Sequence, residues 1–384
     1  MAFDFKALAR FTYKQLFKSS GTPYRLSLKR IGLLLLSYPL YTLVELVNWL
    51  GLALDAILFP GYRREEIRQP VYIIGNPRSG TTFLHRLLAQ DETTFSTMRT
   101  WEMLVAPSIT MRKVFWALSA LDHRLGRPVA RVLGMLEESW QEDNVVHRIA
   151  MRAPEEDDYL LVHIFSCLKI WLYVAMLDEA ERYTYFDSQM PEEDKERIMS
   201  FYTRCLQRHL HAHGHGDKHY LAKDPNFSPL VDTLYWHFPD VRIIYLARNP
   251  LDMIPSYVSL KESEWQLLGD PARAYSSREY ILDMAEHWYS YPLERLEQAP
   301  PGSYTVVDFN DLVKDAGGTV RKIYDRFGLE ISPRFEKILQ RATERARDHE
   351  SEHEYSLQDM GLTREQIIDR YRGVFETFGL AINR

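Results

Sequence analysis

The segment Val71–Thr82, VYIIGNPRSGTT, constrains the fold of this chain more than any other. It predicts a buried strand that ends at Gly75, a loop that turns through Gly80, and a helix over Thr82–Ala89. The backbone N–H groups of such a loop and the positive end of the helix favour an anion, and glycine lets the backbone approach it closely. The segment therefore predicts a phosphate-binding turn between a strand and a helix.

The loop has the spacing of a nucleotide-binding P-loop but lacks its usual cation. Four residues separate Gly75 from Gly80, two hydroxyl residues follow, and Thr81 stands where an NTPase carries lysine. Arg78, inside the loop, offers a planar cation to phosphate or sulfate oxygens. This exchange argues against ATP as the ligand.

A second segment carries a matching pair of polar residues. VRIIYLARN, at Val241–Asn249, predicts a strand that ends in Arg248, and the helix expected over Pro250–Leu260 carries Ser256. Because the serine lies eight residues after the arginine, two turns into the helix, both side chains can face one site.

These two segments resemble the cofactor-binding segments of the sulfotransferases, enzymes that use 3′-phosphoadenosine 5′-phosphosulfate (PAPS). The resemblance covers about Pro70 to the C-terminus, where HEYSLQDMGL at His353–Leu362 resembles the tail of a bacterial sulfotransferase group. It implies PAPS as cofactor, released as the bisphosphate PAP, with no metal required. It also implies two sets of cofactor-binding residues: Arg78, Ser79, Gly80, Thr81 and Thr82 at the 5′ end, and Arg248 and Ser256 at the 3′-phosphate.

Sulfuryl transfer needs cations on the transferring group and the leaving oxygen, and a base for the acceptor proton. Arg78 can supply one cation, and Lys223, at the end of the strand expected over Tyr220–Lys223, resembles the sulfotransferase lysine beside the bridging oxygen. The sequence Lys-Asp-Pro that starts there resembles the tyrosylprotein sulfotransferases, whose base is a glutamate after the P-loop helix. Glu102 is the nearest match to that glutamate.

The assignment of the base leaves alternatives open. Glu102 could equally pair with Arg99, and His147 and Asp224 are the other candidates for the base.

The order of elements predicts the fold class. Strands alternate with helices, a further parallel strand is expected over Tyr304–Phe309, and each ligand-binding motif falls at the carboxyl end of a strand. This pattern indicates an α/β fold, a P-loop-type doubly wound parallel sheet flanked by helices. We expect a sulfotransferase domain over residues 61–384, preceded by a helical N-terminal segment over residues 1–60.

Composition excludes some classes of protein. A chain of 384 residues that is 46% hydrophobic and 26% charged can bury a large core, and its net charge of −6 argues against nucleic acid as a partner. Only Cys167 and Cys205 occur, so no disulfide framework is expected, and this favours the cytoplasm.

The first 60 residues are basic and then apolar. Residues 1–30 hold seven lysines and arginines against Asp4 alone, a charge of +7 − 1 = +6, and the apolar stretch Ile31–Phe59 follows. Glu45, Asp55 and Pro39 interrupt that stretch, which disfavours a spanning helix. Two interpretations remain: a helix lying peripherally on the cytoplasmic face of the membrane, and a helix packed on the domain.

Two polar clusters have structural interpretations. The four acids Glu155–Asp158 follow Pro154 and are expected to cap the start of a helix. Five histidines between His209 and His219 are expected in a solvated loop, without an acidic companion at metal-binding spacing.

The sequence therefore predicts a PAPS-dependent sulfotransferase acting on a hydroxyl, less readily an amine, of a small-molecule or lipid acceptor. The N-terminal segment favours a hydrophobic acceptor. The alternatives are a P-loop nucleotide kinase or NTPase, which would want the missing lysine, and a PAP-binding scaffold that does not catalyse transfer.

Overall fold

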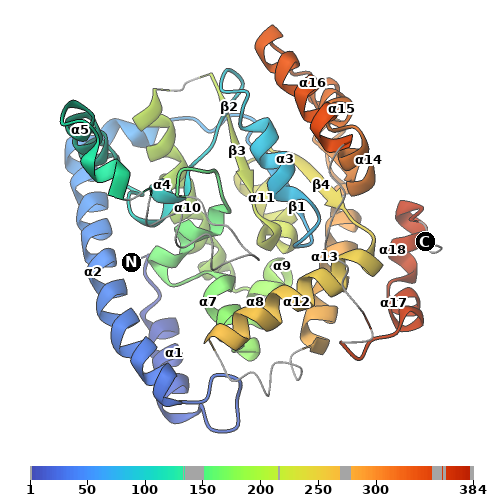
Figure 1. Cartoon of the computed structure of the whole chain (residues 1–384), viewed down its shortest axis with the longest axis horizontal. Coiled ribbons are helices and arrows are strands. Elements are labelled where there is room, and N and C mark those ends of the chain that lie inside the picture. The colour runs from blue at the N-terminus through green and yellow to red at the C-terminus, as the bar shows by residue number, and fades with distance from the viewer. Residues whose placement is uncertain are drawn as a thin grey trace.

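The computed structural model describes residues 2–132, 134, 151–214, 217–268, 278–347, 357 and 360–380. A five-stranded parallel sheet with the order β2-β3-β1-β4-β5 lies at its centre (Figure 1). The strands are β1 (Val71–Gly75), β2 (Phe95–Ser96), β3 (His219–Lys223), β4 (Arg242–Ala247) and β5 (Tyr304–Asp308). The predicted fold class is confirmed, and the two-residue strand β2 is an addition that the sequence analysis missed.

The central strand β1 pairs with β3 on one side and with β4 on the other. From β1 the chain goes to β2 and β3 on one side of the sheet and then crosses to β4 and β5 on the other side. In such sheets ligands bind where the strand order reverses, at the carboxyl ends of the strands. Ile73 is in register with Lys223, and Gly75 with Leu246. The register brings the ends of the predicted ligand-binding strands to one edge.

Helices cover both faces of the sheet. Along β1, Val71 and Ile73 pack in one hydrophobic cluster, whereas Tyr72 and Ile74 pack in the other, as the alternation of a strand requires. The smaller cluster is covered by α3 (Thr81–Leu88), α14 (Phe309–Lys314), α15 (Ala316–Phe327) and α16 (Pro333–Arg347).

The larger cluster packs under the remaining helices, where its largest buried side chains are Trp171, Trp265 and Trp288. These elements are η2 (Asp157–Ile164), α7 (Leu168–Tyr173), α8 (Leu177–Thr184), α9 (Phe186–Gln189), α10 (Glu192–His213), η3 (Pro225–Leu230), α11 (Val231–His237), α12 (Pro250–Leu268), α13 (Arg278–Leu296), α17 (Arg364–Arg370) and α18 (Arg372–Phe378). Four further elements lie nearer the N-terminus: α1 (Phe5–Phe17), η1 (Pro60–Arg64), α4 (Thr100–Leu104) and α5 (Ile109–Arg124).

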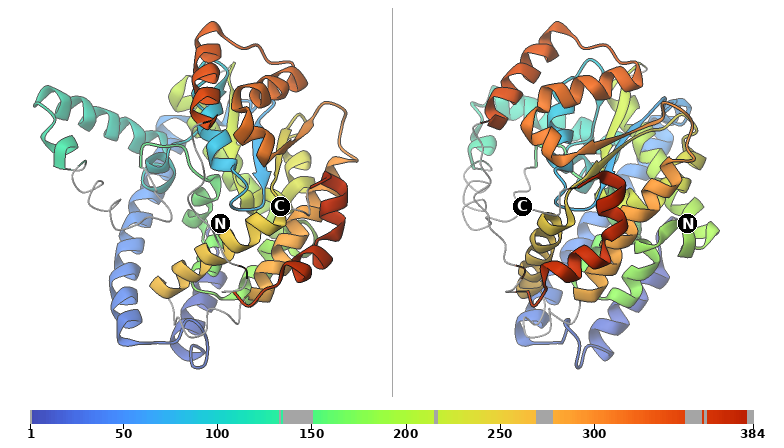
Figure 2. Two further views of the ribbon diagram at one scale, coloured as in Figure 1. Left: turned by 45° about the vertical axis from the view of Figure 1, so that its right-hand side comes forward. Right: turned by 90° about the vertical axis from the view of Figure 1, so that its right-hand side faces the viewer.

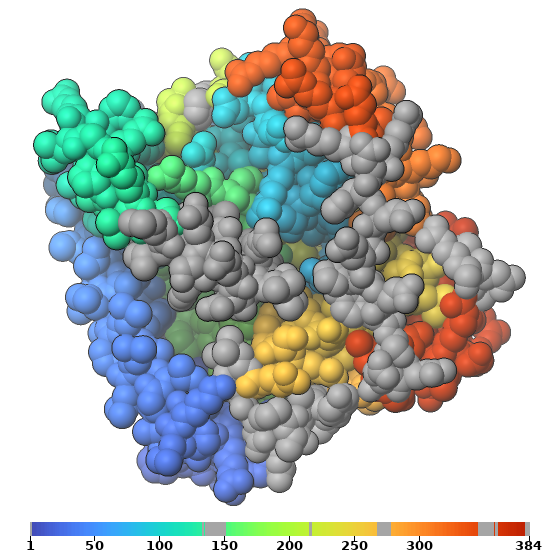
Figure 3. Space-filling view, in the orientation of Figure 1, coloured from blue at the N-terminus to red at the C-terminus, as the bar shows by residue number. Residues whose placement is uncertain are grey.

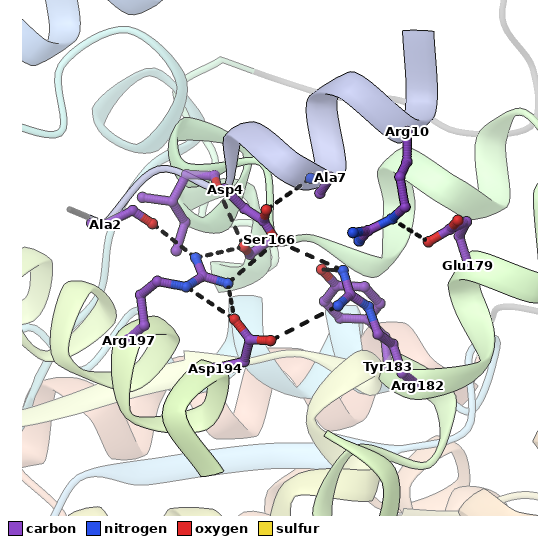
Figure 4. A network of polar contacts seen from close by, with 11 residues as sticks. Ala2, Asp4, Ala7, Arg10, Ser166, Glu179, Arg182, Tyr183, Asp194 and Arg197 are labelled. Atoms are coloured by element: carbon purple, nitrogen blue, oxygen red, sulfur yellow. Dashed lines mark hydrogen bonds and ion pairs between the residues drawn. The ribbon is translucent and has the colours of Figure 1, made fainter. Parts of the chain in front are cut away.

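The N-terminal helix α1 is tied to the body by charged side chains (Figure 4). Arg197 on α10 donates to the Ala2 carbonyl oxygen at 2.8 Å and lies 3.5 Å from the Asp4 carboxylate, while Arg10 pairs with Glu179 at 3.2 Å. Part of the basic charge of residues 1–30 is therefore neutralised by the protein's own acids.

The long helix α2 (Leu28–Leu58) runs along one side of the molecule (Figures 1 and 2). Three polar residues in its second half, Glu45, Asn48 and Asp55, face the body. The Glu45 carboxylate lies 2.8 Å from His163 Nδ1, Asn48 donates to the Leu104 carbonyl oxygen at 3.1 Å, and the Asp55 carboxylate accepts from Arg208 Nε at 3.1 Å. The helix therefore packs on the domain through its polar side.

Candidate active site

The loop after β1 forms the expected turn. Gly80 has φ +87° and precedes the first residue of α3, and a Cβ there would lie 2.7 Å from the Phe309 ring. Glycine is the residue that fits both this conformation and this space. Ser79 lies inside the loop with its Oγ buried and without a hydrogen-bond partner among the described residues. A hydroxyl without a partner, in a loop at the start of a helix, suits a phosphate or sulfate oxygen.

The two cofactor-binding segments meet. Arg78 Nε donates to Ser256 Oγ at 2.9 Å, and Arg248 donates to the Arg78 carbonyl oxygen at 2.6 Å. The Arg248 guanidinium also lies 4.4 Å from the centre of the Phe309 ring. Arg78 and Arg248 lie 170 positions apart in the chain. They nevertheless present their cations at one place on the sheet edge.

Other contacts hold the loop to its neighbours. The Gly75 N–H donates to Ser228 Oγ at 3.0 Å, and this hydroxyl donates back to the Gly75 carbonyl oxygen at 3.0 Å. Asn76 donates to the Ala285 carbonyl oxygen on α13 at 3.2 Å. The sequence analysis missed Ser228 and Asn76, although Ser228 follows the Lys-Asp-Pro motif by only three residues.

Lys223 is fully buried at the end of β3, next to β1. Its Nζ donates to Glu156 Oε1 at 3.0 Å and lies 3.6 Å from Glu155 Oε2. Glu155 in turn accepts from Arg86 on α3 at 2.6 Å. Two carboxylates therefore flank the buried Lys223 amino group at the carboxyl end of β3, beside the strand that leads into the P-loop.

The acids of residues 155–158 mark a helix start as predicted, with Asp157 and Asp158 in the first turn of η2, but the expected capping by a side chain is wrong. A 3₁₀ helix does begin at Asp157, but the Glu156 side chain makes no capping hydrogen bond. Lys169 instead lies 2.6 Å from Glu156 Oε2 and also pairs with Asp158. Asp158 and Glu156 therefore belong to a buried charge network that reaches Lys223.

Asp157 is fully buried, and its Oδ2 accepts hydrogen bonds from Tyr202 at 2.8 Å and Tyr220 at 2.7 Å. Its Oδ1 is buried without a hydrogen-bond partner among the described residues. Burial outweighs the two hydroxyls and raises the pKa of Asp157 to about 7. Asp157 therefore holds its proton at mildly acidic pH.

Glu102 lies within α4, buried, and its carboxylate is fully engaged. Oε2 accepts from the Arg99 N–H at 2.8 Å, and Oε1 lies 2.8 Å from His213 Nε2. Burial alone would raise the pKa of Glu102, but the Arg112 guanidinium and His213 outweigh it and hold the pKa well below its usual range. A carboxylate held in this way is a weak proton acceptor.

The other candidates for the base are placed differently. Asp224 is buried, and it accepts from the Asp158 N–H at 2.7 Å and from the Asn226 N–H at 2.9 Å. Burial and the neighbouring Asp158 raise the pKa of Asp224 well above its usual range. His147 lies outside the described residues, as does most of the segment His353–Leu362.

The histidine cluster is helical, so the predicted loop was wrong for part of it. His209 and His213 lie on α10, with Glu102 as an acidic neighbour, and one ligand atom of each lies within 4.8 Å of the others. However, the Arg112 guanidinium lies 3.0 Å from His209 Nδ1. Similarly, Lys169 pairs with two members of the acidic group Glu156, Asp158 and Asp224. In both groups a side-chain cation stands where a metal ion would bind. His215 lies outside the described residues.

Comparison with known proteins identifies the family. A model of the sulfotransferase family matches residues 70–333. Omega-hydroxy-beta-dihydromenaquinone-9 sulfotransferase Stf3 from Mycobacterium bovis is 25% identical over 349 residues, 88% of this chain and 83% of the relative. The structure of sulfotransferase STF1 from Mycobacterium tuberculosis H37Rv matches with a TM-score of 0.70 at 20% identity, covering 96% of this chain and 91% of that one. Sulfotransferase STF9 from Mycobacterium avium matches with a TM-score of 0.67 at 19% identity, over 86% of this chain and 82% of that one. The fold is thus shared with solved sulfotransferases, and this chain belongs to the sulfotransferase family.

Proposed function

We propose that this protein transfers the sulfuryl group of PAPS to a hydroxyl of a hydrophobic acceptor. The observation that carries the proposal is the meeting of the P-loop with Arg248 and Ser256, beside the buried Lys223. A 3′,5′-bisphosphorylated nucleotide needs cationic groups at both ends, and these segments offer one set for each.

The residues of the site then take the following roles. Ser79 Oγ, the Thr81 and Thr82 hydroxyls and the N–H groups at the start of α3 bind the 5′-phosphosulfate, while Arg248 and Ser256 bind the 3′-phosphate. When bound, PAPS supplies an activated sulfuryl group. Lys223 and Arg78 stabilise the charge that develops on the leaving phosphate and the transferring group.

For the base we propose Glu156 in place of Glu102. The Glu156 carboxylate contacts Lys223 at 3.0 Å, and its side chain is 15% exposed, so an acceptor hydroxyl can reach it. Both carboxylates are paired, Glu156 with Lys169 and Lys223 and Glu102 with Arg112 and His213, but the Glu102 side chain is only 2% exposed. The contact between Glu156 and Lys223 places a proton acceptor next to the group that stabilises the leaving oxygen.

The relative Stf3 suggests the class of acceptor. Its name describes a sulfotransferase for an ω-hydroxylated menaquinone derivative, and the match covers 88% of this chain. A long apolar molecule with a hydroxyl at its end partitions into membranes. We therefore propose a lipid-like acceptor and a peripheral position on the cytoplasmic membrane face, with contact through residues 1–60.

The experiment compares two carboxylate variants in transfer of label from ³⁵S-PAPS to a detergent-solubilised polyprenyl alcohol, without added metal and with a chelator. We expect Glu156→Gln to lower turnover by about 10²–10⁴-fold, as loss of a general base does, and Glu102→Gln to change it far less. If Glu102→Gln alone abolishes transfer, the base assignment is wrong. A requirement for Mg²⁺ would favour the kinase or NTPase alternative, and PAP binding without transfer to any hydroxyl would favour the scaffold.

A further inference from the structure

Helix α2 is built with its polar side inward and its apolar side outward. Both of its acids, Glu45 and Asp55, are buried against the body, whereas most of its leucines and isoleucines are exposed. The exposed fractions reach 73% for Leu35, 69% for Leu36 and 76% for Ile57. A water-soluble helix shows the opposite arrangement, with its apolar stripe toward the core.

Helix α5 adds a second set of exposed apolar side chains. It projects from the body near one end of α2 (Figure 2), and every residue from Lys113 to Leu121 is exposed. Leu118 is 55% exposed and Leu121 is 52% exposed. A helix with this many exposed apolar side chains needs a partner that covers them, since such patches mark interaction sites.

The two helices share one junction. The Asp55 carboxylate of α2 accepts from the backbone N–H groups of Ile109 and Thr110 at 2.8 Å each, and so caps the start of α5. A Cβ at Gly51 would lie 2.4 Å from Ser108 Oγ, so the two helices approach closely there. In the space-filling view α2 and α5 form adjoining surface on one side of the molecule (Figure 3).

We propose that α5 and the outward face of α2 form one surface that inserts into an anionic lipid bilayer. This surface, the α2–α5 surface, consists of the exposed apolar residues Leu35, Leu36, Leu40, Leu43, Leu46, Leu50 and Ile57 on α2 and Val114, Phe115, Trp116, Leu118 and Leu121 on α5. The inference rests on the proposed membrane position of residues 1–60 and extends it to α5. None of these residues takes part in the proposed transfer reaction.

Charge favours a bilayer over a second copy of the chain. Residues 113–132, which comprise most of α5 and the residues after it, include the exposed Lys113, Arg124, Arg127 and Arg131, against the single carboxylate of Asp122. These cations suit anionic headgroups at the edge of the apolar surface. In a two-fold dimer formed through α5, the basic residues of one copy would lie close to the basic residues of the other. Repulsion between these like charges would be unfavourable.

The contacts of α2 also decide how it meets the lipid. Among the described residues it is the one helix long and apolar enough to cross a membrane. However, it is held to the body near its middle by Tyr41, whose hydroxyl donates to the Val162 carbonyl oxygen at 2.9 Å, and near its end by Asp55. A helix bound to a folded domain along its length lies on the bilayer surface and does not span it.

Vesicle flotation tests the α2–α5 surface with matched variants of the full chain. Leu118→Glu with Leu121→Glu changes α5, and Leu36→Glu with Leu43→Glu changes α2. The control, Trp236→Glu with Val306→Glu, adds the same charge at side chains that are 71% and 39% exposed elsewhere. We expect the native protein to float with vesicles of phosphatidylglycerol and phosphatidylcholine, less so with pure phosphatidylcholine or at high salt. Each surface variant should lower the partition coefficient about tenfold or more, and the control by less than about twofold.

A second measurement does not depend on the glutamate variants folding. Leu118→Cys, labelled with a polarity-sensitive thiol dye, should shift its emission to the blue with anionic vesicles, whereas labelled Trp236→Cys should not. Flotation of the α5 variant like the native protein, or an unshifted dye at residue 118, would overturn the proposal. The proposal would also be overturned if the native protein is a dimer and the α5 variant is a monomer that binds vesicles as well as the native protein does.

Discussion

Asp157 is the single residue whose ionisation depends most clearly on the fold. The described structure gives it two tyrosine hydroxyls but no cation in direct contact, and its pKa is raised from 3.8 to about 7. Between these two pH values the folded protein holds a proton that the unfolded chain has lost. Stability therefore falls as pH rises through this window.

Replacing this carboxyl by an amide should remove the effect. We expect the free energy of unfolding of the native protein to fall more steeply from pH 4 to 7 than that of Asp157→Asn, by up to about 1.4 kcal/mol per pH unit. The amide oxygen still accepts from Tyr202 and Tyr220, so the fold is kept. Urea unfolding at several pH values measures both slopes, and parallel slopes would show that Asp157 is ionised in the folded state.

Lys223 illustrates a residue whose position was predictable but whose partners were not. The strand pattern placed it at a carboxyl end, and the structure buries it there. Its neighbours Glu155 and Glu156 come from a segment that the sequence marked only as a helix start. Contacts between residues 67 positions apart depend on tertiary packing, which periodicity does not report.

Removing the Lys223 cation should slow transfer and also reduce stability. We expect Lys223→Ala to lower kcat by roughly 10²-fold or more. Its two carboxylates lose a buried partner, so the unfolding free energy should fall by about 3–5 kcal/mol. Lys261→Ala is the control, since Lys261 is also buried and pairs with Glu264 at 2.7 Å. If Lys223 had only a structural role, Lys223→Ala and Lys261→Ala would lose equal stability. Lys223→Ala would then lower kcat no more than Lys261→Ala does.

At the scale of elements, the P-loop was the most predictable part of the molecule. Glycine spacing, a buried strand and hydroxyl residues all pointed to one local geometry, and the helix begins at Thr81, within one residue of the expected start. By contrast, β2 has two residues, too few for a pattern, and the end of α10 carries histidines that favour no structure strongly.

A pair of glycine substitutions tests whether the loop needs space as well as its backbone conformation. Gly80 has φ +87° with the Phe309 ring in the way of a Cβ, whereas Gly302 has φ +83° with nothing within 4 Å. Both alanine variants carry the conformational cost of about 1 kcal/mol, but only Gly80→Ala must also move the loop. We expect Gly80→Ala to weaken PAP binding at least tenfold and Gly302→Ala to leave it unchanged, as measured by calorimetry. Equal affinities would show that the loop tolerates a side chain.

At the scale of the whole molecule, the structure shows that the N-terminal segment packs on the domain, while its contact with a membrane remains a prediction. Helix α2 packs on the domain and still presents an apolar surface, because its polar residues are the ones that face inward. A linear sequence shows that Glu45 and Asp55 interrupt the apolar run, but not that both point to the same side as their partners His163 and Arg208. The division of the chain near residue 60 remains a prediction.

The contacts of α2 predict that the domain depends on it. Asp55 binds Arg208 on α10 and caps α5, so Asp55→Ala leaves a buried guanidinium and two backbone N–H groups without their acceptor. We expect a loss of about 3–5 kcal/mol in unfolding free energy. Asp178→Ala, which removes a 69% exposed carboxylate paired with Lys14, should cost less than about 1 kcal/mol. Chemical denaturation measures the unfolding free energy of both variants. Equal small losses would mean that the stability of the domain does not depend on α2.

The central claim is that the P-loop and the Arg248 segment form one site for a 3′,5′-bisphosphorylated nucleotide. Titration calorimetry with PAP and with AMP, which lacks the 3′-phosphate, tests it most directly. A charged hydrogen bond contributes about 1.5–3 kcal/mol, so the native protein should bind PAP roughly 10- to 150-fold more tightly than AMP. Arg248→Ala should erase that preference while leaving AMP affinity nearly unchanged. Equal affinity of the native protein for the two nucleotides would contradict the account.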